Sequence, residues 1–264
     1  ERFDRHLETL RRSNHDGRVE YLSVCSPNHL HDAHIRLALR VGADAICEKP
    51  LVLNPWNLDA LSELEEEYGR RVYTILQLRV HPALIELRER LAAESAGRRH
   101  QVVLTYITSR GPWYRYSWKG DNAKSGGIST NIGIHFYDLL MWLFGGEERS
   151  QVHLREDGRA AGAIMLERAD VSWFLSIDRG DLPFEPEPGK PATFRSITID
   201  GEEIEFTGGF TDLHTRVYEE TLAGRGYGIE DARPSVELVQ RLRHQSLEGA
   251  PERLHPFCEK GSKR

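Results

Sequence analysis

The sequence has little cysteine and no excess of positive charge. Its 264 residues include three cysteines, which lie far apart. This argues against a disulfide scaffold and against a zinc site built from paired Cys-x-x-Cys motifs. The formal net charge is −6, with 35 Lys and Arg against 41 Asp and Glu. Because proteins that bind nucleic acid through its phosphates usually carry a basic excess, we expect no nucleic-acid partner.

Long hydrophobic runs are also missing. No apolar stretch approaches the roughly 20 residues that span a bilayer. The polar start of the chain, with Glu1, Arg2 and Asp4, lacks the pattern of a signal peptide. We therefore expect a protein of the reducing cytoplasm with no membrane contact. At roughly 100–200 residues per domain, the length suits one large domain or two modest ones.

The first 80 residues alternate between short apolar runs and amphipathic helical patterns. After an initial helix at 3–10, the expected elements are strand, helix, strand, helix and strand at residues 20–25, 31–41, 44–50, 55–68 and 72–78. Connections this short are typical of right-handed β-α-β units. Residues 1–80 therefore predict an α/β domain with a parallel sheet.

From about residue 98 the pattern changes to a series of strands. We expect these strands at residues 100–109, 151–155, 159–167, 171–178, 195–199 and 203–206. The turn pairs Asp157-Gly158 and Asp200-Gly201 predict hairpins. Helices are expected at residues 132–144, 212–223 and 234–243. Residues 81–264 thus predict an α+β domain with an antiparallel-rich, open-faced sheet and helices on one face.

Polar residues follow two of the expected parallel strands. Ser26 and Asn28 come after the first strand, and Glu48 and Lys49 precede Pro50 at the end of the second. In an open parallel sheet, ligands bind beyond the carboxyl ends of the strands. Burial or nearby cations can lower the pKa of such a lysine until it exchanges protons near neutrality. The alternative is a solvated charge pair on a loop.

A second polar set lies where a glycine-rich turn enters a helix. Asn131, His135 and Asp138 follow Gly126 and Gly127 at i, i+4 and i+7 spacing, which predicts one polar helix face. His135 can serve as a general acid or base, oriented by Asp138 or a backbone group. The alternative is a structural histidine. A metal would need a third ligand, for which the spacing is unsuitable, so we expect no metal.

The third set is an aromatic and basic stretch. Residues 106–124 contain two Trp, three Tyr, two Arg and two Lys. Aromatic rings that stack on sugars or bases, together with cations for phosphate or carboxylate, suit an anionic sugar or a nucleotide. The alternative is an aromatic structural loop.

Three motifs together resemble the Gfo/Idh/MocA family of nicotinamide-dependent sugar oxidoreductases. They are Ser26-Pro27-Asn28-x-x-His31, Cys47-Glu48-Lys49-Pro50 and Gly126-Gly127-x-x-x-Asn131-x-Gly133-x-His135-x-x-Asp138. Within the family, five further stretches are similar to the WlbA/WbpB subgroup: residues 104–111, 117–121, 130–133, 209–215 and 223–228. Members of that subgroup oxidise C3 of UDP-N-acetylglucosaminuronic acid with NAD, on the route to a bacterial surface-polysaccharide (O-antigen) sugar. The resemblance covers nearly the whole chain.

The resemblance implies a role for each matching residue. Lys49 is the principal acid/base, and His135 joins it in the proton relay. The cofactor NAD is lined by Ser26, Pro27, Asn28, His31, Glu48, Lys49 and Gln77. The substrate, a UDP-sugar acid, is held by Arg110, Lys119, Thr130 and Asn131. Many relatives have Asp at the position of Asn131. Because an amide cannot act as a base at neutral pH, the proton chemistry rests on Lys49 and His135.

The resemblance also carries expectations about partners. The subgroup can use 2-oxoglutarate to reoxidise NADH, and the family habit of packing sheet against sheet implies a homotetramer. Two alternatives stay open: another sugar or inositol dehydrogenase of the same fold, and a non-catalytic module that binds a sugar nucleotide.

One departure concerns the start of the chain. The family begins with a strand, a Gly-x-Gly-x-x-Gly turn and a helix that hold the pyrophosphate, and nothing before Tyr21 has this pattern. We therefore expect a fragment that lacks roughly fifty residues of a Rossmann-like domain and binds NAD poorly. The DNA upstream of Glu1 can test this expectation.

Overall fold

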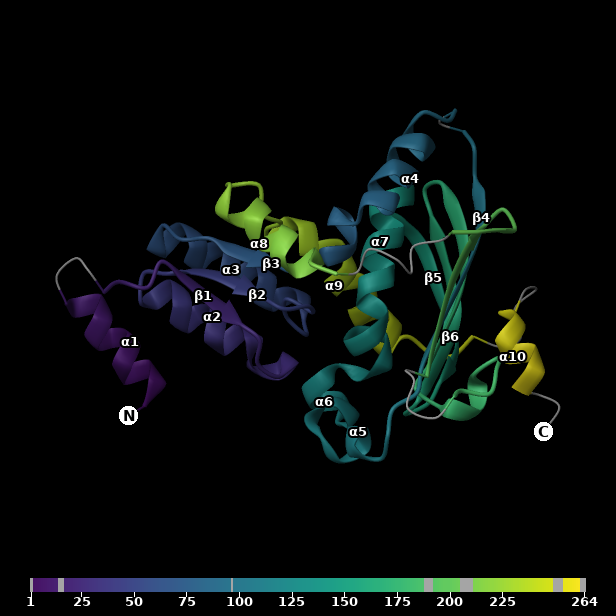
Figure 1. Ribbon diagram of the computed structural model, residues 1–264, viewed down its shortest axis with the longest axis horizontal. Coiled ribbons are helices and arrows are strands. Elements are labelled where there is room, and N and C mark those ends of the chain that lie inside the picture. The colour runs from purple at the N-terminus through teal and green to yellow at the C-terminus, as the bar shows by residue number, and fades with distance from the viewer. Residues whose placement is uncertain are drawn as a thin grey trace.

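The chain folds around two β-sheets, which lie side by side in Figure 1. The computed structural model describes residues 2–13, 17–95, 97–187, 192–204, 211–248 and 254–261. The first sheet has three strands in the order β1-β2-β3, and the second has six in the order β5-β6-β7-β4-β8-β9. Within these described ranges, none of the helices combines the length and apolar character needed to cross a membrane.

The first sheet is parallel, as the alternating pattern predicts. Its strands are β1 (Tyr21–Val24), β2 (Asp44–Cys47) and β3 (Val72–Thr74). The helices of this region are α1 (Phe3–Arg12), α2 (His31–Arg40) and α3 (Pro55–Tyr68). Leu58 and Leu61 of α3 are fully buried, because the apolar stripe of this helix faces the core.

The third strand is shorter than the predicted range 72–78. The chain leaves the sheet after Thr74 and forms the 3-10 turn η2 (Gln77–Val80). A continuous apolar run does not distinguish a strand from a buried turn, so the prediction extended too far. As a result, Gln77 lies beyond the end of the strand, on the side where a ligand can reach it.

The second sheet is mixed, with one parallel pair, β4 and β7, among antiparallel neighbours. Its strands are β4 (His100–Thr108), β5 (Glu147–Arg155), β6 (Arg159–Leu166), β7 (Ala169–Ser176), β8 (Thr193–Ile199) and β9 (Glu202–Glu203). The two predicted hairpin turns join β5 to β6 and β8 to β9. Residues 205–206 of the predicted last strand lie outside the described residues.

Helices cover one face of the second sheet (Figure 1). The main ones are α4 (Pro82–Ala92), α7 (Ile134–Phe144) and α9 (Ile229–His244). The sequence patterns did not predict α4, and they placed the start of α9 too late, at residue 234. The short helices and turns are α5 (Trp113–Tyr116), α6 (Asn122–Ser125), η1 (Asn28–Leu30), η3 (Trp118–Gly120), η4 (Ser129–Gly133) and η5 (Arg179–Asp181).

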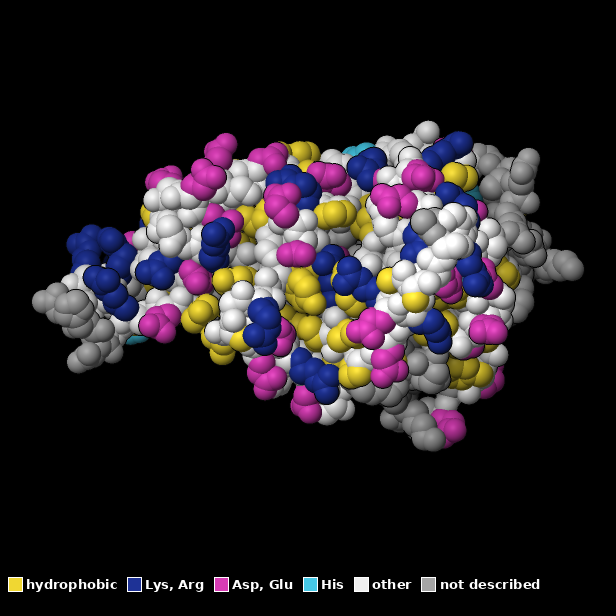
Figure 2. Space-filling view, turned by 90° about the horizontal axis from the view of Figure 1, so that it is seen from above, with side chains coloured by type: hydrophobic (Ala, Val, Ile, Leu, Met, Phe, Trp, Pro, Cys, Tyr) yellow, Lys and Arg dark blue, Asp and Glu magenta, His cyan; other side chains and the backbone are white. Residues whose placement is uncertain are grey.

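The last helices before the C-terminal segment return to the first sheet. Leu213 and Val217 of α8 (Leu213–Leu222) join a buried cluster with Ile46, Ile75 and Val80. Helix α9 contacts both α3 and β3. Helices α8 and α9 thus follow the second sheet in the sequence but pack against elements of the first. The division into two domains at residue 80 stays a prediction. Figure 2 shows charges of both signs interspersed on the visible face.

The opposite face of the second sheet carries helix α10 (Pro256–Gly261) (Figure 1). His255, just before this helix, is buried and stacks on Phe174 with ring centres 5.6 Å apart. Its Nε2 lies 3.2 Å from the hydroxyl of Thr105. Burial lowers the pKa of His255 to about 4, although a backbone hydrogen bond at Leu104 opposes the shift. The ring is therefore neutral in the folded chain at pH 7.

Acid is expected to release this C-terminal segment from the sheet. The unfolded histidine takes up a proton near pH 6.5 and the folded one near pH 4. The contribution of neutral His255 to the free energy of unfolding is therefore fully present above about pH 6.5. It is lost as the pH falls toward 4, by up to about 3 kcal/mol. The protection factors of the backbone amides in residues 254–258, which correct for the slower intrinsic exchange in acid, should fall between pH 7 and pH 4.5. The variant His255→Phe keeps a stacking ring and should lose this pH dependence. Equal protection of the wild type at both pH values would contradict the prediction.

Candidate active site

Lys49 extends from the carboxyl end of β2 into the space between the two sheets. Its ammonium Nζ donates a hydrogen bond to the backbone oxygen of Asn131, at 2.7 Å. Burial lowers the pKa of Lys49 to about 8; Glu48 opposes this shift, and the charges of Lys119 and Arg110 add to it. The amine is thus able to accept and return a proton close to neutral pH.

A glycine-rich turn brings Asn131 to this lysine. Gly126 and Gly127 have φ angles of +81° and +76°, which side chains with a Cβ rarely adopt. The chain then passes through the π-helical turn η4 into α7. The Asn131 amide donates to the hydroxyl of Tyr114 at 3.0 Å, and its oxygen accepts from the Asn28 amide at 3.4 Å. Because this side chain is held on both sides, Asn131 is suited to positioning and not to proton transfer.

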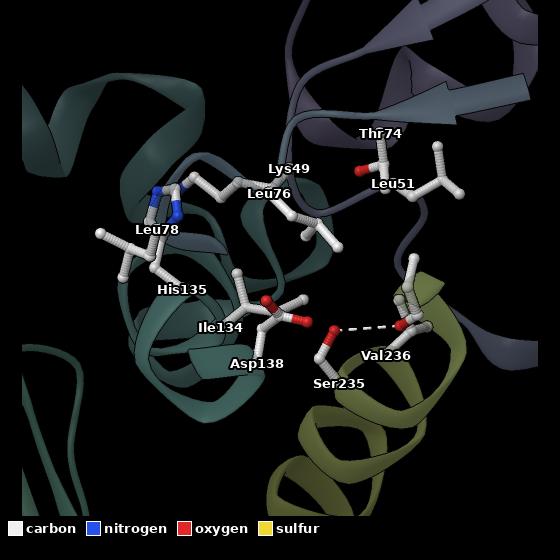
Figure 3. Close-up of a pocket in the computed structure, with 11 residues that line it drawn as sticks. Lys49, Leu51, Thr74, Leu76, Leu78, Ile134, His135, Asp138, Ser235 and Val236 are labelled. Carbon is white, nitrogen blue, oxygen red and sulfur yellow. Dashed lines mark hydrogen bonds between the residues drawn. The ribbon is translucent and has the colours of Figure 1, made fainter. Parts of the chain in front are cut away.

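His135 lies one turn further along, at the start of α7. Figure 3 shows the Lys49 side chain extending toward the His135 ring. Burial lowers the pKa of His135 well below its ordinary value, and the positive charges of Lys49, His214 and Arg195 lower it further. The ring is therefore neutral at pH 7, in the form that can accept a proton. The structure brings together the two residues that the sequence assigned to proton chemistry.

Asp138, the third member of the predicted polar face, has a different partner. Arg79 of η2 donates two hydrogen bonds to its carboxylate, from Nη2 to Oδ1 at 2.7 Å and from Nε to Oδ2 at 3.0 Å. Arg79 also pairs with Asp231 of α9 at 3.2 Å. Burial raises the pKa of Asp138, while the charge of Arg79 opposes the shift. Asp138 is thus engaged in a buried ion pair with Arg79, in place of the expected role of orienting His135. Through Asp138 and Asp231, Arg79 joins η2 to α7 and α9.

Lys49 and His135 line one open cleft of about 200 Å³. Its other lining residues are Gln77, Leu78, Tyr106, Arg110, Asn131, Ile132, Phe136 and Arg195. Three of the lining side chains are cations, and among the described residues that line the cleft none carries a carboxylate. Such a cleft is complementary to an anionic ligand.

Two polar side chains that line the cleft, Tyr106 and Arg195, are not among the predicted site residues. Arg195 on β8 stands opposite Tyr106 on β4 in the strand register, with its guanidinium 5.5 Å from the ring centre. The aromatic stretch hinted at Tyr106, but no local signal marks Arg195. Only the pairing of two distant strands brings it to the cleft.

The residues expected to line the cofactor lie at the carboxyl ends of the parallel strands. Gln77 faces the cleft, and its Oε1 is buried with no hydrogen-bond partner in the described part of the chain. An amide N–H, such as that of a nicotinamide carboxamide, fits this acceptor. Glu48 lies 3.1 Å from the Nε2 of His214 on α8. The residues of this end of the sheet therefore fit NAD.

The residues that follow β1 are mainly engaged with the protein itself. Asn28, just after Pro27, is buried and donates to the backbone oxygen of Ser125 at 2.9 Å. The ring nitrogens of His31 lie 2.7 Å and 2.8 Å from the backbone oxygens of Pro50 and Ser26. Burial, the largest influence, lowers the pKa of His31. These contacts fix the two strand ends, and a direct role toward the cofactor stays a prediction.

The four residues expected to hold the substrate have different surroundings. Arg110 and Asn131 line the cleft. The Lys119 ammonium lies 5.6 Å from the ring centres of both Trp113 and Trp118. Thr130 is fully buried beneath the glycine turn, where a Cβ on Gly126 would come within 2.7 Å of it, and it does not line the cleft. Arg110 and Asn131 are thus the two best placed for contact with a ligand.

Family models match both parts of the chain. Residues 2–76 match the oxidoreductase-family NAD-binding Rossmann fold, and residues 88–171 match the C-terminal alpha/beta domain of the same family. The first match covers the three strands of the first sheet, and the second includes α7, the helix on which His135 lies.

Solved structures of a Thermus thermophilus protein are highly similar to this chain. The WlbA (WbpB) dehydrogenase from that organism, in complex with NAD and alpha-ketoglutarate, is 54% identical with a TM-score of 0.89, and the match covers 97% of this chain and 82% of that one. A second structure of the dehydrogenase, in complex with NAD and UDP-GlcNAcA, is 53% identical with a TM-score of 0.88, covering 97% and 81%.

Curated relatives are more distant. Myo-inositol dehydrogenase Hyg17 from Streptomyces leeuwenhoekii is 28% identical over 148 residues, which is 56% of this chain and 42% of that protein. D-glucoside 3-dehydrogenase from Escherichia coli K12 is 27% identical over 128 residues, 48% of this chain and 36% of that protein. The chain thus spans about two fifths of the length of these curated relatives. Taken together with the matches to the family models and to the Thermus structures, this shows that the chain belongs to the Gfo/Idh/MocA oxidoreductase family and that NAD is its cofactor.

Proposed function

We propose that the enzyme oxidises the C3 hydroxyl of UDP-N-acetylglucosaminuronic acid to a ketone. The observation that carries the proposal is the cleft in which Lys49 and His135 meet Arg110 and Arg195 without any described lining carboxylate. A uronic acid brings a carboxylate that these arginines can hold. The highly similar Thermus dehydrogenase, crystallised with NAD and UDP-GlcNAcA, supports the same substrate.

The residues divide the chemistry between them. Oxidation removes a hydride from C3 and a proton from its oxygen, and bound NAD supplies the acceptor for the hydride. Neutral Lys49 takes the hydroxyl proton, and the neutral ring of His135 beside it joins the proton relay by accepting a hydrogen bond from the ammonium group that forms. The backbone oxygen of Asn131 fixes the position of Nζ. Gln77 would accept a hydrogen bond from the cofactor through its unpartnered Oε1. In this proposal residues 1–80 form the cofactor domain and residues 81–264 the substrate domain.

The proposal extends to the partners of the reaction. The same cations suit a dicarboxylate, so 2-oxoglutarate is the acceptor that we assign to NADH reoxidation, and the Thermus structure with alpha-ketoglutarate supports this. We place the reaction in the cytoplasm, in the synthesis of a surface-polysaccharide sugar, and we propose a homotetramer. Light scattering of the purified protein tests the tetramer.

Oxidation of a neutral polyol is the second candidate, because myo-inositol and glucoside dehydrogenases are among the curated relatives. A neutral polyol, however, offers nothing to pair with the arginines of the cleft. A non-catalytic module is less well supported, since a binding protein has no need of a lysine whose pKa is lowered to about 8.

The carboxylate of the substrate is expected to raise kcat/KM about 100-fold. We compare UDP-N-acetylglucosaminuronic acid with UDP-N-acetylglucosamine, which differs only in that group, and with myo-inositol and glucose. Loss of charge-assisted hydrogen bonds worth about 2–3 kcal/mol corresponds to this ratio. The assay follows NADH absorbance, using the complete gene product with any residues encoded before Glu1. Turnover confined to the free polyols would contradict the proposal.

A further inference from the structure

A second, much smaller cavity lies directly behind Lys49 and His135 (Figure 3). Its volume of about 10 Å³ is close to the least that holds one water molecule and is far too small for a cofactor or a sugar. Thr74, Asp138 and Ser235 provide its other polar side chains, and apolar residues complete the lining. The cavity thus sits where the end of β3 meets α7 and α9.

Thr74 points an unsatisfied hydroxyl into this region. It is the last residue of β3 and only 1% exposed, and its Oγ1 has no hydrogen-bond partner among the residues that the structure describes. Its backbone is anchored separately, because its N–H donates to the oxygen of Tyr227 at 2.9 Å. A buried hydroxyl without a partner is destabilising, so a ligand that hydrogen-bonds to Oγ1 would relieve a cost already present in the fold.

On the opposite side of the cavity, the side chains of Asp138 and Ser235 can accept further hydrogen bonds. Each oxygen of the Asp138 carboxylate accepts one hydrogen bond from Arg79 and has a further lone pair. The Ser235 hydroxyl donates to the backbone oxygen of Ala232 at 2.9 Å, which leaves its oxygen able to accept. In Figure 3, Thr74 lies on one side of the space and Asp138 and Ser235 on another, with His135 and Lys49 along a third.

We infer that this cavity is a binding site for one water molecule, which links Thr74 and Asp138 to the Lys49–His135 pair. Apolar cavities of this size stay dry, whereas a site with two to four polar partners retains its water. The water gives the amine and the ring a fixed hydrogen-bonding neighbour on the side away from the substrate. Thr74 is then a positioning residue that acts through this water, a role that rests on the proposed function.

The test compares Thr74→Val with Thr74→Ser. Valine has nearly the same shape but lacks the hydroxyl, whereas serine keeps it. We expect Thr74→Val to lower kcat about tenfold and to leave KM within twofold, because misplaced reacting groups slow the chemical step without weakening binding. It should also lower Tm by about 2–4 °C, because the water loses a partner. Serine should restore most of both quantities.

The thermal measurement separates this inference from the proposed function. If the cavity is dry, valine removes an unpaired hydroxyl and Tm rises or stays the same, which overturns the inference. An unchanged kcat in Thr74→Val, even with a lower Tm, also overturns the positioning role. If the wild type fails to oxidise the UDP-sugar acid, the proposed function fails, while the difference in Tm still decides whether water occupies the cavity.

Discussion

Replacing Lys49 with methionine is expected to lower kcat for oxidation of the UDP-sugar acid by about 10²–10⁴-fold. Methionine keeps the length of the side chain and removes the group that takes the hydroxyl proton. The neighbouring Asn131 cannot replace it, since an amide is not a base at neutral pH and its side chain is held by Tyr114 and Asn28. The assay follows NADH production at saturating substrate and NAD.

The pH dependence provides a second readout of the same residue. The pKa of Lys49 is lowered to about 8, so kcat/KM of the wild type should rise about tenfold per pH unit below pH 8 and level off above it. Lys49→Met should lose this limb. As a control, Arg11→Met removes an exposed cation of α1 that pairs with Glu8 at 3.0 Å, and its rate should equal that of the wild type. A loss of less than tenfold in Lys49→Met would make the lysine a bystander.

The sequence was most informative where local pattern and fold agree. In residues 20–69, apolar runs and helix-ending glycines predicted β1, α2, β2 and α3 in order. The positions of Lys49 and Asn28 at strand ends followed from the general rule for parallel sheets. That Lys49 and His135 line one cleft could not be deduced from spacing, because 85 residues separate them and only the packing of two sheets brings them together.

The sequence-based prediction was wrong for two helices: it placed the start of α9 too late and did not include α4. The sequence pattern predicts a helix start at Pro234, but α9 begins earlier, at Ile229. There, Asp231 accepts a hydrogen bond from the N–H of Gly228 at 2.8 Å, which helps to offset the bond that proline cannot make. Helix α4 was missed, although Pro82 stands in its first turn and Leu84, Leu87 and Leu91 form its buried stripe.

Arg79 has a central structural role that no local sequence pattern predicts. It lies in the short turn η2 after β3, one residue beyond the predicted strand 72–78, and its partners are 59 and 152 positions away in the chain. Its guanidinium joins Asp138 of α7 to Asp231 of α9 and lies 5.3 Å from the ring centre of Tyr227. These contacts secure the junction on which the approach of His135 to Lys49 depends.

Arg79→Met is therefore expected to lower the free energy of unfolding by about 3–5 kcal/mol, measured by urea denaturation. The Arg79 and Asp138 side chains are 11% and 4% exposed, so removal of the cation leaves a carboxylate buried without its main partner. Adding Asp138→Asn to Arg79→Met should recover part of the loss, because the uncompensated charge is then gone. The matched control is Arg36→Met, which breaks a more exposed pair with Asp32 at 2.8 Å and should cost less than about 1 kcal/mol. If Arg79→Met costs no more than the control, the contacts of Arg79 do not hold this junction, and the packing of α7 against α9 alone must position His135 beside Lys49.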